Sequence, residues 1–504
     1  MQPQKFLFVI GFILSKYALS FVFFYLMVIF YNPNTIGTVQ FAIALVSIFS
    51  FISSLGFEVA HLKIYPEEED KAACIGTLLT YKGFFIAISL IFYFFLLNFI
   101  NLDFFLTVIL IIFILDQIIQ GVNSSMSKIL MADGEIIKGS FPWVIISSSK
   151  IILLVVGLFI FPSNELTLAG IYLFSTILHF LFLLIFIVPY KIRKPNKYLM
   201  SKYFKYTYPL SFSAIAVLIS GNIGIVLIKF WISSEAVAFY YAGDHLSVFR
   251  TVIPNVISFV MVSIFSKNLK EKNLEKNEMY IKNLTKYFSI LWSAIIFLSF
   301  LYSDELIIIF LGEIYSPSIF VFNILILAQI IVINDIAVLT DLNARGLTKI
   351  FSTIKVIGEI YNIFLTIFFI APFGLNLGIN GVALSILFKN LTYAPIIRFY
   401  LWKKYKYSFN FEVFLYLIAA LIIILISPLY TSQFDLIKLF YIIPLLILID
   451  IALYIGILYL FRVLKKEDFK KILPILNIKN SIKVLREGLT SKNNNSERTN
   501  ETGI

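Results

Sequence analysis

Long apolar runs, separated only by short polar breaks, constrain the fold of this chain more than any other feature of its sequence. Each run has about 20 residues, enough for an α-helix to cross the roughly 30 Å of hydrocarbon in a bilayer. Fourteen runs occupy residues 6–30, 36–59, 73–98, 104–128, 141–161, 166–189, 207–232, 236–266, 287–302, 318–340, 350–371, 378–400, 411–430 and 439–462. Because backbone polar groups must be paired in lipid, we expect an all-α polytopic membrane protein with about 14 transmembrane helices. The ninth run is interrupted at residues 303–305, and the apolar piece 306–311 is either its continuation or a re-entrant turn.

The composition agrees with lipid as the solvent. Of 504 residues, 60% are hydrophobic and 14% charged, whereas soluble domains carry about 25% charged residues. The first run is too long for the apolar core of a signal peptide, and we interpret it as a retained helix. Cys74 is the only cysteine, which excludes an intrachain disulfide. With three histidines beside it, we expect neither a metal site nor a cofactor.

Lysine and arginine residues are dense in every second loop between the predicted helices. The dense loops lie at residues 63–71, 128–138, 191–205, 267–286, 345–349 and 403–406, whereas the loops between them hold Lys438 alone. Basic loops remain on the cytoplasmic side. We therefore expect a multi-pass protein of the bacterial inner membrane with both termini in the cytoplasm. This distribution accounts for the net charge of +12 without nucleic-acid binding.

The first six predicted helices and the next six share features that indicate an internal repeat. Ala132-Asp133-Gly134 follows the fourth helix, and Ala344-Arg345-Gly346 follows the tenth. Since six is even, both units enter from the same side, as parallel bundles around a central cavity. The expected organisation is a six-helix bundle at 1–190, a basic cytoplasmic linker at 191–206, a second bundle at 207–402, two additional helices at 403–462, and a basic, partly disordered cytoplasmic tail at 463–504.

This arrangement resembles the MOP exporter superfamily, which includes the MATE transporters. Within it, the chain looks most like the polysaccharide translocases, the Wzx-type O-antigen flippases. The stretch from Ile36-Gly37 to Gly56-Phe57 is similar to the second-helix pattern of that group, and Gly378 to Leu384 is similar to its twelfth-helix entry. The resemblance implies transport of an undecaprenyl-diphosphate-linked oligosaccharide, with membrane lipids and a polymerase and chain-length regulator of the same pathway as partners.

Ionisable residues inside the predicted helices are costly unless they face protein or water, so each is a functional candidate. The cations near mid-depth are Lys16, Lys82, Lys150, Arg250 and Lys389. We expect them to line the cavity and to attract an anionic substrate; the alternative is that each pairs locally. Lys355 and Glu359, at i and i+4 on one helical face, are expected to pair with each other.

Polar residues at depth give a second group of candidates. Asp116, Gln120 and Asp244 are expected to face the cavity or to take part in coupling to an ion. Asp450 lies outside the two repeats, and we interpret it as structural. Pro254 cannot bond the carbonyl of Arg250, which predicts a kink or hinge at that level of the eighth helix.

The expected function is alternating-access translocation of the lipid-linked oligosaccharide, such as an O-antigen repeat unit, from the cytoplasmic to the outer leaflet, without catalysis. A multidrug exporter and a lipid II flippase remain alternatives. The excess of cations argues against the exporter, which moves organic cations. A membrane-bound polymerase or glycosyltransferase is a weaker alternative, because no large polar loop and no phosphate-binding glycine-rich loop is present.

Overall fold

The computed structural model describes residues 3–99, 103–252, 274–407, 411–432 and 440–464. It also describes the single positions Pro254, Ser258, Met261, Phe265, Asn268, Leu269, Phe434 and Asp468. In this part of the chain all regular secondary structure is helical, which confirms the all-α fold class. The predicted tail at 463–504 lies outside the described residues, apart from Val463, Leu464 and Asp468.

The helices follow the order of the predicted spans. The first unit contains α1 (Pro3–Phe30), α2 (Pro33–Ser54), α3 (Phe57–Glu67), α4 (Lys71–Phe99), α5 (Phe104–Ala132), α6 (Ile136–Ser140), α7 (Pro142–Ile160) and α8 (Glu165–Ile187). The second contains α9 (Lys197–Trp231), α10 (Ser234–Leu246), α12 (Leu274–Leu311), α13 (Ser318–Leu327), α14 (Gln329–Ala344), α15 (Thr348–Ile370) and α16 (Gly378–Tyr405). The last helices are α17 (Glu412–Ile426), α18 (Pro428–Thr431) and α19 (Ile443–Leu460).

Twelve of the described helices are long and apolar enough to cross a membrane. The other two predicted spans, the eighth and the tenth, are interrupted. The eighth begins as α10, which ends at Leu246, and the tenth is divided into α13 and α14 at Ala328. The ninth span is longer than expected, because α12 continues through Ser303-Asp304-Glu305 to Leu311. The apolar piece 306–311 is therefore its continuation and not a re-entrant turn.

The two glycine loops that suggested a repeat have the same backbone geometry. Gly134 and Gly346 both adopt a left-handed conformation, with φ of +88° and +76°. After each glycine, an amide bonds back across the helix end, from Glu135 to the Leu130 carbonyl at 2.9 Å and from Leu347 to the Leu342 carbonyl at 3.1 Å. This is the glycine-terminated helix end in which a left-handed residue satisfies the last carbonyls. The repeated sequence signal thus corresponds to a repeated local structure.

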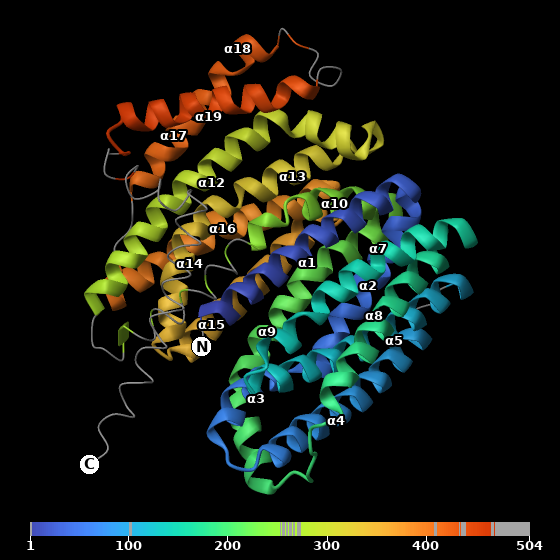
Figure 1. Ribbon diagram of the computed structural model, residues 1–504. Helices are drawn as coiled ribbons and strands as arrows, with labels where there is room; N and C mark the ends of the chain where they lie inside the picture. Colours follow the sequence, from blue (N-terminus) through green and yellow to red (C-terminus); the bar gives the residue numbers. More distant parts are fainter. Residues whose placement is uncertain are drawn as a thin grey trace.

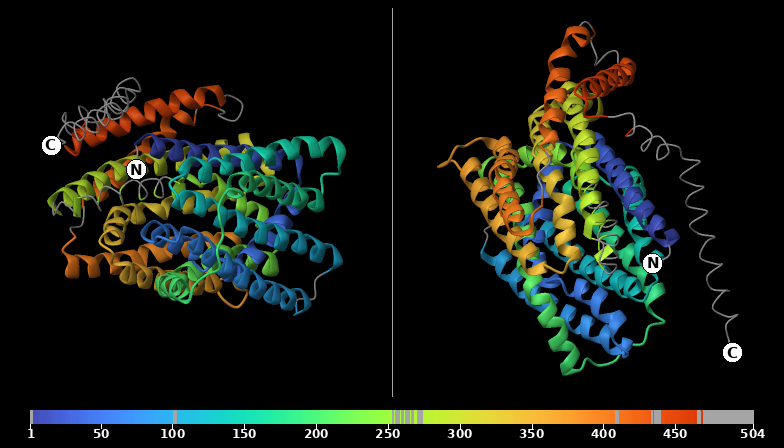
Figure 2. Two further views of the ribbon diagram at one scale, coloured as in Figure 1. Left: turned by 60° about the horizontal axis from the view of Figure 1, so that its bottom comes forward. Right: turned by 90° about the vertical axis from the view of Figure 1, so that its left-hand side faces the viewer.

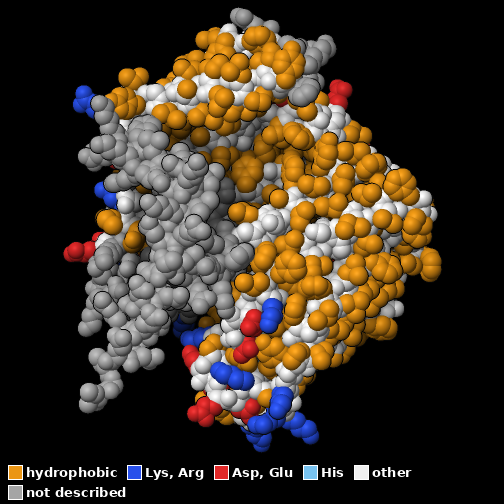
Figure 3. Space-filling view, in the orientation of Figure 1, with side chains coloured by type: hydrophobic (Ala, Val, Ile, Leu, Met, Phe, Trp, Pro, Cys, Tyr) orange, Lys and Arg blue, Asp and Glu red, His pale blue; other side chains and the backbone are white. Residues whose placement is uncertain are grey.

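The helices run up and down between two ends of an elongated bundle (Figure 1). We call one the basic end: α1 starts there, α5 and α14 end there, and the segment 188–196 lies there (Figure 1). The other is called the opposite end. In Figure 3, Lys and Arg side chains gather with Asp and Glu at the basic end, whereas hydrophobic side chains cover the flanks. Apolar flanks with the charged side chains gathered at one end are what a membrane-spanning bundle requires.

The last helices form a separate layer. In Figures 1 and 2, α17 and α19 lie on the outside of α12, away from the first unit. Asp450 of α19 anchors them, because it accepts hydrogen bonds from Tyr302 of α12 at 2.5 Å, from Tyr430 of α18, and from Ser427 at 3.3 Å. The carboxylate is fully buried, and its hydroxyl donors satisfy it within the protein.

The segment joining the two units is tied to the first unit. Arg193 donates its amide to the carbonyl of Ala72 at 3.1 Å, and its guanidinium contacts Asp70 at 2.8 Å. Helix α9 begins at Lys197, so the second part of the expected linker at 191–206 belongs to this helix. The connection is therefore a short extended stretch followed directly by helix.

Candidate functional site

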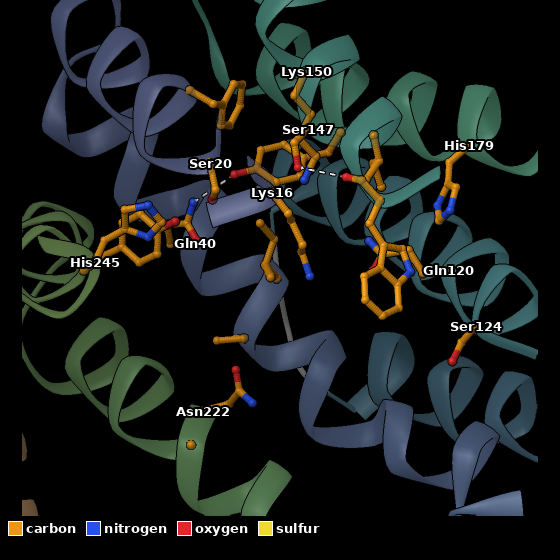
Figure 4. A pocket seen from close by; sticks show the side chains of 18 of the residues that line it. Lys16, Ser20, Gln40, Gln120, Ser124, Ser147, Lys150, His179, Asn222 and His245 are labelled. Atoms are coloured by element: carbon orange, nitrogen blue, oxygen red, sulfur yellow. Dashed lines mark hydrogen bonds between the residues drawn. The ribbon is translucent and has the colours of Figure 1, made fainter. Parts of the chain in front are cut away.

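A cavity of about 620 Å³ lies between the two units. Helices α1, α2, α5, α7 and α8 of the first unit form most of its wall, and α9 and α10 of the second unit complete it. Figure 4 shows Lys16 and Lys150 in this space, with Gln120, Ser124 and His179 on one side and Asn222 and His245 on the other. The lining combines cations, polar side chains and aromatic rings, as in sites that bind one kind of ligand.

Helical spacing explains why these side chains share one wall. On α7, Trp143, Ile146, Ser147 and Lys150 all line the cavity, and they follow the i, i+3, i+4, i+7 pattern of a single helical face. On α5, the lining face carries Gln120, Ser124, Ser127 and Lys128. The polar face of this helix therefore faces the cavity from Gln120 onward.

Three lysines line the cavity: Lys16 of α1, Lys128 of α5 and Lys150 of α7. Within the described residues none of them forms an ion pair. Their ammonium groups lie over aromatic rings instead. Lys16 and Lys128 are 5.6 Å and 5.7 Å from the ring centre of Trp143, and Lys150 is 4.0 Å from that of Tyr172. The ammonium groups are thus stabilised by rings, and no carboxylate among the described residues is in direct contact with them.

Among the described residues, Asp244 is the only carboxylate in the lining, and it is paired with Arg250. Arg250 also donates through Nε to Ser247 at 3.1 Å. Arg250 itself is not part of the lining, because its guanidinium turns back toward the end of α10. The expected role of Arg250 as a cation facing the cavity therefore does not match its position. The net charge of the lining, three lysines against one paired carboxylate, is positive.

Asp116 lies behind the lining. Its side chain is 2% exposed, and Gln120, which does line the cavity, donates to its Oδ2 at 2.7 Å. The other oxygen, Oδ1, has no hydrogen-bond partner within the described residues. Asp116 therefore supports Gln120 from the second layer of side chains and does not face the cavity directly.

Two of the expected cavity cations lie elsewhere. Lys82 is 5% exposed and pairs with Glu58 at 2.9 Å, between α4 and α3. Lys389 of α16 contacts both carboxylate oxygens of Glu359 at 3.5 Å. Lys82 and Lys389 are therefore each paired locally, which was the alternative to lining the cavity. The reason is that a carboxylate on a neighbouring helix lies within reach of each, which the position of a lysine in its own helix does not reveal.

The expected pairing within α15 is also different. Glu359 contacts Lys389, as described above, whereas the Lys355 ammonium lies 4.9 Å from the ring centre of Phe351. The i, i+4 spacing placed Lys355 and Glu359 on one face of the helix, but the neighbouring helix α16 provides a closer partner for the carboxylate.

The eighth span bends, but not at the expected position. Helix α10 ends at Leu246 and a turn follows at Ser247 and Val248, several residues before Pro254. Asp244 and Arg250 flank this turn and bond across it. The residues on both sides of Pro254 lie outside the described part of the chain, so a hinge at Pro254 stays a prediction.

Several lining residues escaped the sequence-based selection: Gln40, Lys128, Trp143, Tyr172, His179, Asn222 and His245. Lys128 was assigned to a loop, yet α5 extends to Ala132 and keeps it within the helix. The signal that could have found it is the spacing Gln120, Ser124, Lys128, which continues one polar face by steps of four. No comparable signal marks the aromatic residues, because aromatic side chains are common throughout this chain.

The family model described as "Polysaccharide biosynthesis protein" matches residues 4–269, which is more than half of the chain. No curated protein sequence matches the chain.

Solved structures show where the fold recurs. The structure titled lipid II flippase MurJ in an inward closed conformation has a TM-score of 0.74 at 14% identity, covering 92% of this chain and 100% of that one. An inward-facing MATE family multidrug resistance transporter of the MOP superfamily has a TM-score of 0.65 at 15% identity, with 78% and 94% covered. A MOP superfamily transporter from Pyrococcus furiosus has a TM-score of 0.57 at 14% identity, with 79% and 96% covered. At these identities the likeness concerns the fold.

Proposed function

Because this chain belongs to the polysaccharide biosynthesis protein family, we propose that it is a flippase that moves an undecaprenyl-diphosphate-linked oligosaccharide, such as an O-antigen repeat unit, from the cytoplasmic to the outer leaflet of the bacterial inner membrane. The chain is a multi-pass membrane protein with the fold of MOP superfamily transporters. Beyond the family and the fold, the proposal specifies the transported substrate, the membrane and the direction of transport.

One observation carries the proposal: Lys16, Lys128 and Lys150 line the cavity between the two units without an ion-pair partner among the described residues. In a site shielded from bulk water, attraction between opposite charges is much stronger than at a protein surface. A diphosphate carries at least two negative charges in a small volume, and lysine ammonium groups bind phosphate as point charges. The lining therefore suits the diphosphate of a lipid-linked sugar.

The transport cycle follows from which end of the cavity is closed. At the opposite end, α2 of the first unit packs against the start of α10 in the second, and Thr38 donates to Ser234 at 3.0 Å. We expect the substrate to enter from the basic end, which faces the cytoplasm in our proposal. Rocking of the two units then opens the opposite end. The polyprenyl chain stays among membrane lipids, and a polymerase with its chain-length regulator receives the product.

Two other transport functions use the same fold. A multidrug exporter for organic cations needs free carboxylates in its cavity, yet Asp244, the one lining carboxylate in the described part of the chain, already pairs with Arg250. This charge distribution disfavours cationic drugs. A lipid II flippase would bind the same diphosphate through the same lysines, so the sugar part of the substrate separates this function from the proposed one.

The test measures flipping in proteoliposomes that contain the purified full-length chain. Two substrates are compared: an undecaprenyl-diphosphate-linked oligosaccharide and lipid II, each with a label that an impermeant reagent can quench. We expect flipping of the oligosaccharide lipid, with at least a tenfold decrease for Lys16→Ala and for Lys150→Ala at substrate concentrations below saturation. Flipping of lipid II alone would assign the alternative substrate, and efflux of organic cations without lipid flipping would refute the proposal.

A further inference from the structure

Two positions on α7 mark two groups of cations in the cavity: Trp143, which Lys16 and Lys128 contact, and Lys150. Trp143 is near the start of this helix at the basic end, and Lys150 follows seven residues later on the same face. Seven residues correspond to about 10.5 Å of helical rise, or nearly two turns. The backbone positions of Trp143 and Lys150 are therefore separated along the direction in which a transported group has to move.

The group nearer the basic end contains two lysines around one indole. Lys16 and Lys128 come from different helices, and both ammonium groups lie within 5.7 Å of the ring centre of Trp143. Lys128 is also near the end of α5, one turn before Ala132. We call Lys16, Lys128 and Trp143 the entry subsite, because they lie toward the end from which the substrate would enter.

The group nearer the opposite end has one lysine. The Lys150 ammonium lies 4.0 Å from the ring centre of Tyr172, and the Tyr172 hydroxyl accepts a hydrogen bond from Gln40 at 3.4 Å. We call Lys150, Tyr172 and Gln40 the inner subsite. Gln40 is three residues after Gly37, where α2 packs against the second unit, so the inner subsite lies directly beneath the closed end of the cavity.

In both subsites each ammonium group is contacted by an aromatic ring and not by a carboxylate. A ring face attracts a cation through its quadrupole but has no net charge. A lysine held in this way can contact an incoming anion directly. An ion-paired lysine such as Lys82 would first have to leave its carboxylate.

We propose that these are two anion subsites in series, and that the diphosphate of the lipid-linked substrate binds first at the entry subsite and then moves to the inner subsite before the opposite end opens. The inference rests on the proposed function and assigns its steps to residues. The two subsites use different rings, Trp143 of α7 and Tyr172 of α8, so the diphosphate leaves one ring-bound group of cations for the other. The entry subsite offers two cations and the inner subsite one, so resting binding is tighter at the entry subsite.

The test separates binding from turnover, using full-length protein and undecaprenyl diphosphate as the probe. The dissociation constant is measured in detergent, and flipping is measured in proteoliposomes at saturating substrate. We expect Lys128→Gln and Trp143→Leu to raise the dissociation constant about tenfold with little effect on the saturated rate. Lys150→Gln is expected to leave the dissociation constant within twofold and to lower the saturated rate at least tenfold.

Conservative and distant variants control for loss of folding. Lys128→Arg and Trp143→Phe keep a cation and a ring, and should restore binding to within threefold of wild type. Trp231→Leu removes an indole that packs against Phe373 at the end of α9, outside the cavity lining, and should change neither quantity.

The outcomes distinguish this inference from the proposed function. If Lys128→Gln and Lys150→Gln change the same quantity to the same extent, the cavity has a single subsite and the serial arrangement is wrong, although the flippase function stands. If the wild-type protein binds undecaprenol as tightly as undecaprenyl diphosphate, the anion-binding cavity itself is refuted, together with the function proposed from it.

Discussion

Gly37 of α2 packs directly against the backbone of Ser234 at the start of α10, joining the two units at the opposite end. A Cβ atom at position 37 would lie 1.7 Å from the Ser234 carbonyl oxygen, so only glycine allows this approach without movement of a helix. Ile36-Gly37 is part of the stretch by which the sequence resembles the polysaccharide translocases. The contact gives a physical reason for the glycine: it permits closure of the cavity.

Gly37→Ala should therefore weaken the closed opposite end. The added methyl group meets backbone, which cannot give way as a flexible side chain can, and overpacking of this kind costs about 1–3 kcal/mol. We expect an impermeant thiol reagent to label Gln40→Cys, in a Cys74→Ala background, about tenfold faster from the opposite end. Gly170→Ala is the control, because a Cβ there meets nothing within 4 Å. Unchanged labelling in Gly37→Ala would show that this contact does not hold the end closed.

A disulfide across the same contact should stop transport reversibly. Thr38 and Ser234 belong to different units, and their hydroxyl oxygens are 3.0 Å apart, so cysteines at these positions are close enough to be bridged. In the Cys74→Ala background, oxidation of Thr38→Cys/Ser234→Cys should abolish flipping, and a reductant should restore it. The matched pair Thr366→Cys/Ser385→Cys joins two hydroxyls 2.8 Å apart within the second unit and should cross-link without loss of flipping. Full activity of the cross-linked Thr38–Ser234 pair would exclude opening at this end.

Lys82→Met should destabilise the protein. The change leaves the Glu58 carboxylate buried without its lysine, and breaking a buried pair from one side costs about 3–5 kcal/mol. We expect a lower free energy of unfolding in detergent, with partial recovery in Lys82→Met/Glu58→Gln, where no uncompensated charge remains. Lys16→Met should leave stability nearly unchanged, because Lys16 has no ion pair among the described residues. Equal destabilisation by both single variants would contradict the distinction between a paired and a cavity-facing lysine.

Tyr302→Phe should loosen the last helices without affecting the cavity. The Tyr302 hydroxyl donates to the buried carboxylate of Asp450 at 2.5 Å, and loss of a donor to a buried charged group costs about 1–3 kcal/mol. Thermal unfolding in detergent should occur at a lower temperature, whereas the dissociation constant for undecaprenyl diphosphate should not change. Tyr459→Phe, at an exposed position of α19, is the control. If Tyr302→Phe unfolds like wild type, the Asp450 cluster does not hold these helices.

Much of the architecture could be predicted because it depends on local properties of the chain. Helix length and apolarity are determined by neighbouring residues, and the left-handed turns at Gly134 and Gly346 follow from residues that tolerate positive φ. The broken eighth and tenth spans were harder to predict. The turn at Ser247 and Val248 carries no proline or glycine, and the Asp244–Arg250 contact across it forms only once the helix has ended.

In the candidate site, too, some features depend on one helix alone and others on the packing between helices. Periodicity alone places Gln120 on a polar face of its helix and identifies Lys16 and Lys150 as costly charges in the membrane, and the structure locates all three in the cavity lining. It does not reveal that Lys82 and Lys389 have carboxylate partners on neighbouring helices. Nor does it show that Lys128 joins the lining. Each of these facts depends on how one helix is rotated against the next.

By itself, the sequence determines that this protein lies in a membrane, that its segments are helical, and which end of the bundle is basic. These properties follow from transfer free energies and backbone preferences, which act within a single helix. Only the tertiary structure decides which buried charges are neutralised and which remain available. Attraction between charges falls off with distance and depends on the surrounding medium, and both are set by the packing of helices that are far apart in the sequence.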